Sequence, residues 1–484
     1  MFVGRENELS SLKELLGKET ASLVACRGRR RIGKSTLFRE FARRNRLKFL
    51  VIEGLAPRKG QRNQDQLRNF SERLCAQTSG ARVVAESWMA AFELLGERLD
   101  DRRKTLVLLD EISWMGQHEA DFPGLLKNGW DDVLKHHDNL ILVLCGSVSS
   151  WIQDNLLESA TFGGRFSRSF VLRELPLALC VKFWRGKETR FALREIIDVL
   201  SVTGGVPRYL EEMDPSLSAN ENIRRMCFQE NGPLFKDFNA IFNETFGSTS
   251  LLKADILRKL SQGASTCSEL AKSLGIERGG SLSRNLEELV EAGFIAKNFN
   301  VNPQTGRQEK TSAYRVCDNY TRFYLKYLEP HEDAIRNGRY LFDGFGSLPE
   351  WSTILGLQFE NLVVNHVQSL LPFLHLDGRP IDSAAPYFFR GGKGKPGVQI
   401  DLLIQTGGTA YLVEIKRRQH IDTEIVGEME EKVHNFPKRR GVSVRTALVY
   451  EGNLATAVIR SGVFDIIVPF ADLLGLPARA SSDH

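Results

Sequence analysis

The chain of 484 residues lacks the cysteine pattern of a zinc-binding or disulfide-stabilised protein. Its seven cysteines are scattered, and no two of them form a Cys-x-x-Cys pair. An odd, dispersed set of cysteines is typical of free thiols in a reducing compartment. The pattern therefore argues against a zinc site.

The chain also lacks a hydrophobic run long enough to cross a membrane, the longest lying near Leu140–Val148. No secretory leader is visible after Phe2, so we expect a cytoplasmic protein without a membrane partner. A strong charge bias is missing too, with 65 Lys and Arg against 60 Asp and Glu and a net charge of +5. This balance permits nucleic-acid binding but does not argue for it.

A phosphate-binding pattern follows the first apolar run of the chain. Leu23–Cys26 predict a short buried strand, and residues 28–35 have the Gly-x4-Gly-Lys-Ser spacing of a P-loop. Glycines let backbone amides approach a phosphate, Lys34 supplies positive charge to the β- and γ-phosphates, and Ser35 offers a hydroxyl to Mg²⁺. The helix expected from about Thr36 directs its positive end at the same anion. The predicted nucleotide-binding residues of this loop are Gly28, Arg29, Arg30, Arg31, Ile32, Gly33, Lys34, Ser35 and Thr36.

A pair of carboxylates ends a later apolar run. Thr105–Leu109 predict a buried strand, which leads directly into Asp110 and Glu111. In the Walker B arrangement, the first carboxylate holds Mg²⁺ and the second polarises the attacking water. We therefore expect Asp110 to bind magnesium and Glu111 to act in hydrolysis.

An arginine lies between the next two predicted strands, Leu140–Leu144 and a strand around Phe170–Leu175. Arg165 follows Phe162-Gly-Gly, where an arginine can stabilise the charge of a phosphoryl-transfer transition state. An arginine in a solvated loop explains the residue equally well. The sequence leaves both roles open.

Taken together, these motifs resemble the archaeal-type AAA-like ATPases of the STAND group. The motifs are Phe2-Val-Gly-Arg-Glu, the P-loop, Leu108-Leu-Asp-Glu, Gly164-Arg165 and Thr203-Gly-Gly-Val-Pro. The resemblance implies ATP as the nucleotide, with Gly204, Gly205 and Pro207 at a helical lid that crosses it. The Asn-Lys-x-Asp motif of guanine-binding proteins is absent from the sequence.

The order of the predicted elements indicates an α/β protein of several domains. Alternating strands and helices in the first part predict a P-loop NTPase parallel sheet. A helical lid and a winged-helix domain follow, and then a C-terminal α/β domain whose Asp401 and Glu414-x-Lys416 resemble those of the restriction-endonuclease type. The predicted boundaries are 1–176 for the ATPase core, 177–247 for the lid, 248–345 for the winged helix and 346–484 for the nuclease-like domain.

The winged helix is predicted from three helices and a hairpin. Amphipathic segments at 251–260, 265–275 and 281–292 precede a hairpin that starts at Gly293. The residues that it would offer to DNA are Arg278, Ser283, Arg284, Asn285, Arg307 and Lys310. Glu287, Glu288 and Glu291 lie on the same helix and would repel phosphates, so packing within the protein remains an equal alternative.

Two predicted strands near the C-terminus carry acidic residues and a lysine. Strand alternation places Glu414 and Lys416 on one face of their strand, with Asp401 on the neighbouring strand. This Asp…Glu-x-Lys pattern resembles the PD-(D/E)XK nuclease core. The resemblance implies that Asp401 and Glu414 bind Mg²⁺, that Lys416 orients or activates water, and that Glu360 on an upstream helix is an accessory carboxylate.

The sequence supports three functions. The first is an ATPase whose nucleotide state controls Mg²⁺-dependent nucleic-acid cleavage, in defence against foreign DNA or in DNA processing. The second is a regulatory switch that binds DNA or partner proteins without cleavage, and the third is a scaffold that uses its winged helix for packing. ATP and DNA are the expected partners, and a homo-oligomer is allowed.

Overall fold

The structure is a computed structural model, and the chain divides into two compact units. The first comprises Met1–Arg173, Asn239–Ser250 and Glu291–Gly293. The second comprises Glu174–Phe238, Leu251–Val290 and Phe294–His484. The structure describes residues 1–100, 102–147, 149–159, 162–246, 250–302, 308–389, 391 and 396–476. The four predicted domain boundaries stay predictions beside this division.

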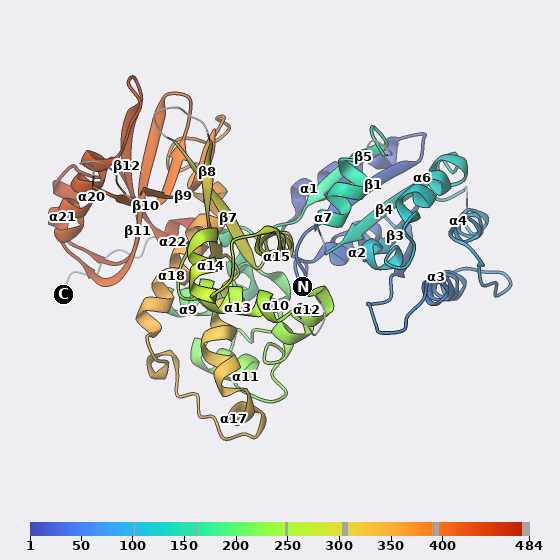
Figure 1. The fold of residues 1–484 in the computed structure, drawn as a ribbon, viewed down its shortest axis with the longest axis horizontal. Coiled ribbons are helices and arrows are strands. Elements are labelled where there is room, and N and C mark those ends of the chain that lie inside the picture. The colour runs from blue at the N-terminus through green and yellow to red at the C-terminus, as the bar shows by residue number, and fades with distance from the viewer. Residues whose placement is uncertain are drawn as a thin grey trace. The chain divides into compact units, whose positions relative to one another are not determined.

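The first unit is built on a five-stranded parallel sheet of order β2-β3-β4-β1-β5 (Figure 1). Its strands are β1 Ser22–Arg27, β2 Lys48–Glu53, β3 Thr105–Asp110, β4 Leu140–Gly146 and β5 Phe166–Val171. Crossover connections with helices join strands that run in the same direction. The predicted parallel α/β sheet is confirmed.

Helices cover both faces of this sheet. On β3, Leu106 and Leu108 belong to one buried cluster, whereas Val107 and Leu109 belong to another. The first cluster includes residues of α1 (Glu6–Lys13) and α2 (Lys34–Arg44). The second includes residues of α3 (Asn63–Gln77), α4 (Trp88–Glu97) and α6 (Phe122–Asp132). Because both faces are buried, the central strands are continuously apolar rather than alternating.

Strand β5 differs from its predicted position. It begins at Phe166 and ends at Val171, in parallel register with β1. The predicted strand around Phe170–Leu175 was placed too late, because Leu172 and Leu175 are buried in the segment after the strand. An apolar run marks burial, and here the burial continues beyond the hydrogen-bonded ladder.

The second unit contains the predicted winged helix. Its helices are α13 Leu251–Leu260, α14 Cys267–Leu274 and α15 Gly280–Glu291, and its sheet has the order β6-β8-β7 (Ser265–Thr266, Gln308–Val316, Ile295–Val301). Thr266 caps α14 in a capping box with Glu269, and Gly275 ends the helix in the left-handed conformation. These residues confirm the predicted start and end of the second helix.

Other helices of the second unit surround a buried aromatic segment. Residues of α16 (Asn319–Phe323) and of the helical turn after it are nearly all buried, so this segment belongs to the core. The remaining main helices are α8 Leu177–Cys180, α9 Leu193–Thr203, α10 Pro207–Glu211, α11 Ala219–Cys227, α12 Asp237–Phe246, α17 Glu332–Arg336, α18 Trp351–Asn365 and α19 Val367–Leu370. The segment predicted as a lid is therefore helical. Helix α12 begins in the second unit and ends in the first.

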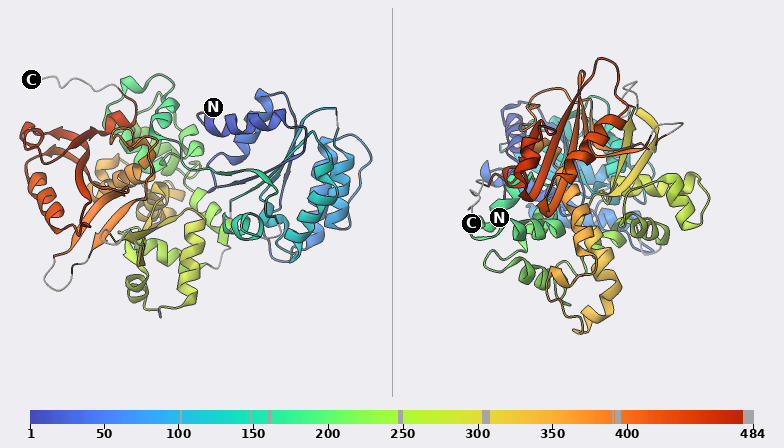
Figure 2. Two further views of the ribbon diagram at one scale, coloured as in Figure 1. Left: turned by 90° about the horizontal axis from the view of Figure 1, so that it is seen from above. Right: turned by 90° about the vertical axis from the view of Figure 1, so that its left-hand side faces the viewer.

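The C-terminal part of the second unit is a mixed five-stranded sheet (Figure 2). Its order is β13-β12-β11-β10-β9, with strands Ile466–Pro469, Ser443–Leu454, Thr409–Ile421, Val398–Gln405 and Ser383–Phe389. Strands β9 to β11 are antiparallel, and β11 to β13 are parallel. The parallel connections run through α20 (Glu424–Asn435) and α21 (Thr456–Arg460), and α22 (Phe470–Leu473) follows β13.

Some sequence expectations lie beyond what the structure describes. The tip of the wing, including Arg307, and residues 392–395 of the Gly-rich segment fall outside the described residues, as does the side chain of Lys310. Within the described residues, no helix is both long enough and apolar enough to cross a membrane.

Candidate nucleotide site and C-terminal acidic site

The P-loop backbone takes conformations that favour glycine. Gly28 has φ 153°, and a Cβ there would lie 2.5 Å from the carbonyl oxygen of Leu172. Gly33, with φ 89°, caps α2, which begins at Lys34 rather than at the predicted Thr36. A side chain at Gly28 would clash with backbone, so both glycines shape the loop.

Lys34 and Ser35 lie at the start of α2 with their polar atoms already engaged. The ammonium of Lys34 donates to the carbonyl oxygens of Gly28 and Arg29, at 2.8 and 3.1 Å. The hydroxyl of Ser35 donates to Oδ2 of Asp110 at the end of β3. A hydroxyl beside a carboxylate fits Mg²⁺, which takes few protein oxygens and completes its shell with waters and substrate phosphates.

Glu111 is held in a strained conformation beside Asp110. Its φ of 50° is in the left-handed region, which is uncommon for a residue with a side chain. Oε2 of Glu111 accepts hydrogen bonds from the backbone amide of Ser147 at 3.1 Å and from its hydroxyl at 2.8 Å. The end of β4 therefore fixes the orientation of this carboxylate.

Arg30 of the P-loop connects Glu111 to a segment far along the chain. Its Nη2 lies 3.8 Å from Oε1 of Glu111, and its Nη1 pairs with Glu244. The guanidinium also lies 4.8 Å from the ring centroid of Trp114. Sequence reasoning placed Arg30 in the nucleotide loop but missed Trp114 and Glu244, since no local pattern relates residues so far apart.

A third carboxylate at the same sheet edge was also missed. Glu53 ends β2, directly opposite Asp110 in the strand register. Burial, and then the charge of Asp110, raises the pKa of Glu53 above its usual value. Its position could have been found from the sequence, because the carboxyl ends of parallel strands meet at one edge.

Arg165 is engaged in an ion pair within the first unit. Its Nε and Nη2 donate to the two oxygens of Asp131, at 3.0 and 2.8 Å. The hydrogen bond from Arg165 lowers the pKa of Asp131 to about 2, assisted by Lys127. An arginine finger would have to leave this pair, so the transition-state role stays a prediction.

The Gly-Gly-x-Pro segment belongs to the second unit. Pro207 begins α10, and Gly204 ends α9 with φ 55°. The amide of Gly205 donates to Oε2 of Glu174 at 3.1 Å, and its carbonyl accepts from Leu175 at 2.8 Å. The role of Pro207 at the nucleotide stays a prediction.

The acidic residues predicted near the C-terminus form one electrostatic cluster, which we call the C-terminal acidic site (Glu360, Asp401, Glu414 and Lys416). Asp401 accepts from the amide of Ile415 on the neighbouring strand at 2.9 Å. Burial, followed by the charges of Glu414 and Glu360, raises the pKa of Asp401 well above its usual range. Burial and Glu414 also raise the pKa of Glu360 on α18, although Arg322 opposes the shift.

Glu414 is the most enclosed member of this site, with its side chain 2% exposed. The ammonium of Lys416 lies 2.9 Å from its Oε1, and the ammonium of Lys432 donates to its Oε2 at 2.5 Å. Lys416 also pairs with Glu428, at 3.1 Å. Lys432 and Glu428 come from α20 and were missed, because nothing in their local sequence marks them as neighbours of β11.

The C-terminal acidic site does not fit a divalent metal as it stands. Among the described residues, no group of three or more His, Cys, Asp or Glu side chains is placed to hold a metal ion. The carboxylate of Glu414 faces two ammonium groups instead. The predicted ligand set of Glu360, Asp401 and Glu414 is therefore close in space but not arranged around a common point.

The predicted DNA-facing helix carries an internal contact. Lys253 of α13 donates to Asn285 at 2.7 Å and pairs with Glu288 at 2.7 Å. Ser283 and Arg284 are exposed on the same helix. Asn285 is thus engaged within the domain, whereas Arg284 points to solvent.

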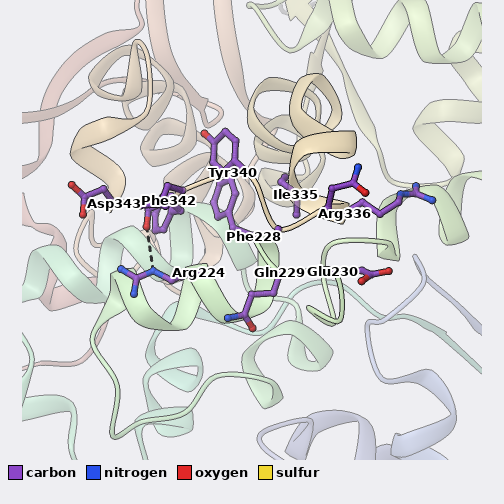
Figure 3. A pocket seen from close by; sticks show the side chains of 12 residues that line it. Arg224, Phe228, Gln229, Glu230, Ile335, Arg336, Tyr340, Phe342 and Asp343 are labelled. Carbon is purple, nitrogen blue, oxygen red and sulfur yellow. Dashed lines mark hydrogen bonds between the residues drawn. The ribbon is translucent and has the colours of Figure 1, made fainter.

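A separate cavity of about 700 Å³ lies in the second unit (Figure 3). Phe228 stacks between Tyr340 and Phe342, with ring centroids 5.2 and 4.4 Å apart. Arg224 donates to the carbonyl oxygen of Phe342 at 3.2 Å. The cavity is lined by none of the predicted site residues.

Two parts of the chain match known protein families. The family described as an ATPase domain predominantly from Archaea matches residues 2–213, and the family described as a helix-turn-helix domain matches residues 253–298. The chain thus contains an archaeal-type ATPase domain followed by a winged helix-turn-helix domain. Neither match extends into the C-terminal sheet.

The proteins and structures that match a larger part of the chain are distant from it. An uncharacterized protein of Methanocaldococcus jannaschii is 25% identical over 384 residues, which cover 78% of this chain and 80% of that protein. A Walker-type ATPase of Pyrococcus abyssi is similar in structure, with 18% identity, a TM-score of 0.46 and coverage of 67% of this chain and 96% of that chain. The ORC2 protein of Aeropyrum pernix has 14% identity and a TM-score of 0.34, over 68% of this chain and 91% of that chain.

Proposed function

We propose that the chain hydrolyses ATP in its first unit and that its nucleotide state controls a C-terminal nuclease-like domain that acts on DNA. The observation that carries the ATPase part is the convergence of Lys34, Ser35, Asp110 and Glu111 at one edge of the parallel sheet. Ser35 is hydrogen-bonded to Asp110, and Glu111 is fixed by Ser147. The archaeal-type ATPase domain supports the same conclusion.

Each of these residues has a separate task in hydrolysis. Lys34 exchanges its two backbone carbonyl partners for phosphate oxygens, which are stronger acceptors because they are charged. Ser35 and Asp110 would hold Mg²⁺, which neutralises phosphate charge when it is bound. Glu111 orients the attacking water and accepts its proton, while Ser147 keeps one carboxylate oxygen fixed and the other lies 3.8 Å from Arg30.

The nuclease-like assignment is supported by the cluster around Glu414. Asp401 and Glu414 lie on paired strands, Lys416 lies 2.9 Å from Glu414, and Glu360 adds a third carboxylate in electrostatic contact. DNA as the substrate is supported by the helix-turn-helix match and the exposed Arg284. Among the described residues, these carboxylates are not arranged around a common metal position.

The test is DNA cleavage with Mn²⁺ or Mg²⁺, in the presence and absence of ATP. We expect plasmid or single-stranded DNA to be cut by the wild type with ATP. We expect Lys416→Ala to abolish cutting while ATP hydrolysis persists. Lys438→Ala, at an exposed position outside the acidic site, is the matched control and should cut normally.

A second candidate function is an ATP-dependent switch that binds DNA or partner proteins without cleavage. The observation that favours it is the pairing of Glu414 with two lysines, which occupy both of its carboxylate oxygens without a metal. Absence of cleavage under every condition, together with intact ATP hydrolysis and salt-sensitive DNA binding, would select this candidate.

A further inference from the structure

We propose that Lys432 is the resident cation of the C-terminal acidic site, so that a divalent metal ion reaches Glu414 only when the Lys432 ammonium leaves it. The proposal deepens the nuclease-like assignment and rests on it for its functional meaning. Its structural basis is independent, because it depends only on the contacts of Glu414.

The first step concerns burial. Glu414 is 1% exposed and lies in the middle of β11, with the apolar cluster of the C-terminal sheet around it. An ionised carboxylate in such a place needs a cation beside it, because burial removes its hydration. The site must therefore keep a cation beside Glu414 whenever this carboxylate is ionised.

The second step separates the two lysines. Lys432 donates a hydrogen bond to Oε2 of Glu414 and has no other ion-pair partner among the described contacts. Lys416 lies 2.9 Å from the other oxygen, Oε1, and is shared, since it also pairs with Glu428 at 3.1 Å. Both oxygens of Glu414 are thus occupied by ammonium groups, so a metal ion must displace one of them, and Lys416 is the one that a second carboxylate holds in place.

The third step concerns the distance and the repulsion between a metal ion on Glu414 and the Lys432 ammonium. A Mg²⁺ ion binds carboxylate oxygen at about 2.1 Å, so an ion on Oε2 of Glu414, the oxygen that Lys432 contacts, would lie within about 5 Å of the Lys432 nitrogen. Two cations so close in a buried site repel each other strongly. The Lys432 ammonium already occupies this oxygen, so the metal and the ammonium exclude one another there.

The fourth step is that Lys432 can leave without unfolding its helix. Ile425 and Met429 anchor α20 in the core of the C-terminal sheet, whereas the Lys432 side chain is 20% exposed. A lysine side chain has a flexible four-carbon stem, so its ammonium can turn to solvent while the helix stays in place. The contact between Lys432 and Glu414 can therefore break and re-form while the helix stays packed, and we call this contact the Lys432 latch.

The experiment is a Mn²⁺ titration of the nucleotide-free full-length protein. Calorimetry measures the binding of the ion, and thermal unfolding measures its effect on stability. The variants are Lys432→Met, Lys432→Met combined with Glu414→Gln, and Lys438→Met as the exposed control. We expect Lys432→Met to bind one additional Mn²⁺, at least about tenfold more tightly than the wild type, and to be stabilised against heat by the ion. The double variant should lose both effects, and the control should match the wild type.

Two results would overturn the proposal. One is a Glu414-dependent Mn²⁺ site in the wild type with the same affinity as in Lys432→Met. The other is a folded Lys432→Met that gains no site. If that variant does not fold, Lys432→Gln keeps a neutral donor to Glu414 and answers the same question. Because these readouts are metal binding and stability, failure of DNA cleavage would reject the nuclease function without affecting this result.

Discussion

The nucleotide site and the C-terminal acidic site use the same residue types and differ in what the lysine contacts. In the P-loop, Lys34 is held by two backbone carbonyls, and Asp110 is left to a neutral hydroxyl. At the C-terminal acidic site, Lys416 and Lys432 contact the carboxylate of Glu414 directly. In the first arrangement the Asp110 carboxylate faces no cation among the described residues, whereas in the second both oxygens of Glu414 already face ammonium groups.

The difference shows that a set of carboxylates and lysines does not define a metal site by composition alone. A lysine held by carbonyls can exchange them for phosphate at little electrostatic cost. A lysine paired with a buried carboxylate must be displaced before a metal binds, which costs the pairing energy. The contrast therefore predicts a nucleotide-dependent metal site in one unit and a latched site in the other.

The largest effect is expected from Lys34→Ala. Removing the charge that faces the phosphates should lower ATP turnover by about 10²-fold or more, measured as phosphate release. Lys59→Ala, at an exposed position outside the P-loop, should leave turnover unchanged. If Lys34→Ala turned over ATP within a few-fold of the wild-type rate, the P-loop would not be the site of ATP hydrolysis.

Glu111→Gln should slow hydrolysis by roughly 10²- to 10³-fold while ATP still binds, because the amide cannot accept the proton of water. The measurements are phosphate release and equilibrium binding of labelled ATP. Glu97→Gln, at an exposed glutamate of the same unit, is the control. Equal loss of binding and turnover would assign Glu111 to nucleotide binding instead.

Asp198→Asn should change the pH dependence of stability. Burial raises the pKa of Asp198 to about 6, with Arg417 and Arg194 opposing, so the folded state keeps its proton longer than the unfolded chain. Wild-type stability should therefore fall by about 1–3 kcal/mol as the pH rises from about 4 to 6, and this fall should vanish in the variant. Denaturant unfolding measures it, with the exposed Asp377→Asn as control; parallel pH profiles would contradict the shift.

Glu244→Gln should have the smallest effect, a roughly two- to five-fold decrease in ATP turnover. Without Glu244, the guanidinium of Arg30 is drawn toward Glu111, which becomes a weaker base. Phosphate release measures the change, and Glu230→Gln serves as an exposed control. An unchanged rate would mean that the Arg30–Glu244 pair is not coupled to Glu111.

Much of the fold could be predicted because its signals are local. The strand before Asp110, the caps of α14 and the hairpin of β10 and β11 all follow from short patterns. The boundary of β5 could not, since buried residues continue past the strand. Local patterns report burial and turns, but the extent of a ladder depends on the partner strand.

The candidate sites were predicted in their local parts and missed in their long-range parts. Lys34, Asp110, Glu414 and Lys416 stand in recognisable short motifs. Their partners come from distant segments: Glu244 reaches the P-loop across 214 residues, and Lys432 reaches Glu414 from the next helix. Such partners change what a motif can bind, and only the folded arrangement reveals them.

The most direct test of the contrast between the two sites is the number of Mn²⁺ ions bound per wild-type chain, with and without a non-hydrolysable ATP analogue. We predict no tightly bound ion without nucleotide and one with it, because the nucleotide site needs phosphate oxygens and the C-terminal acidic site is latched by Lys432. A tightly bound ion in the nucleotide-free protein that is lost in Glu414→Gln would contradict the account.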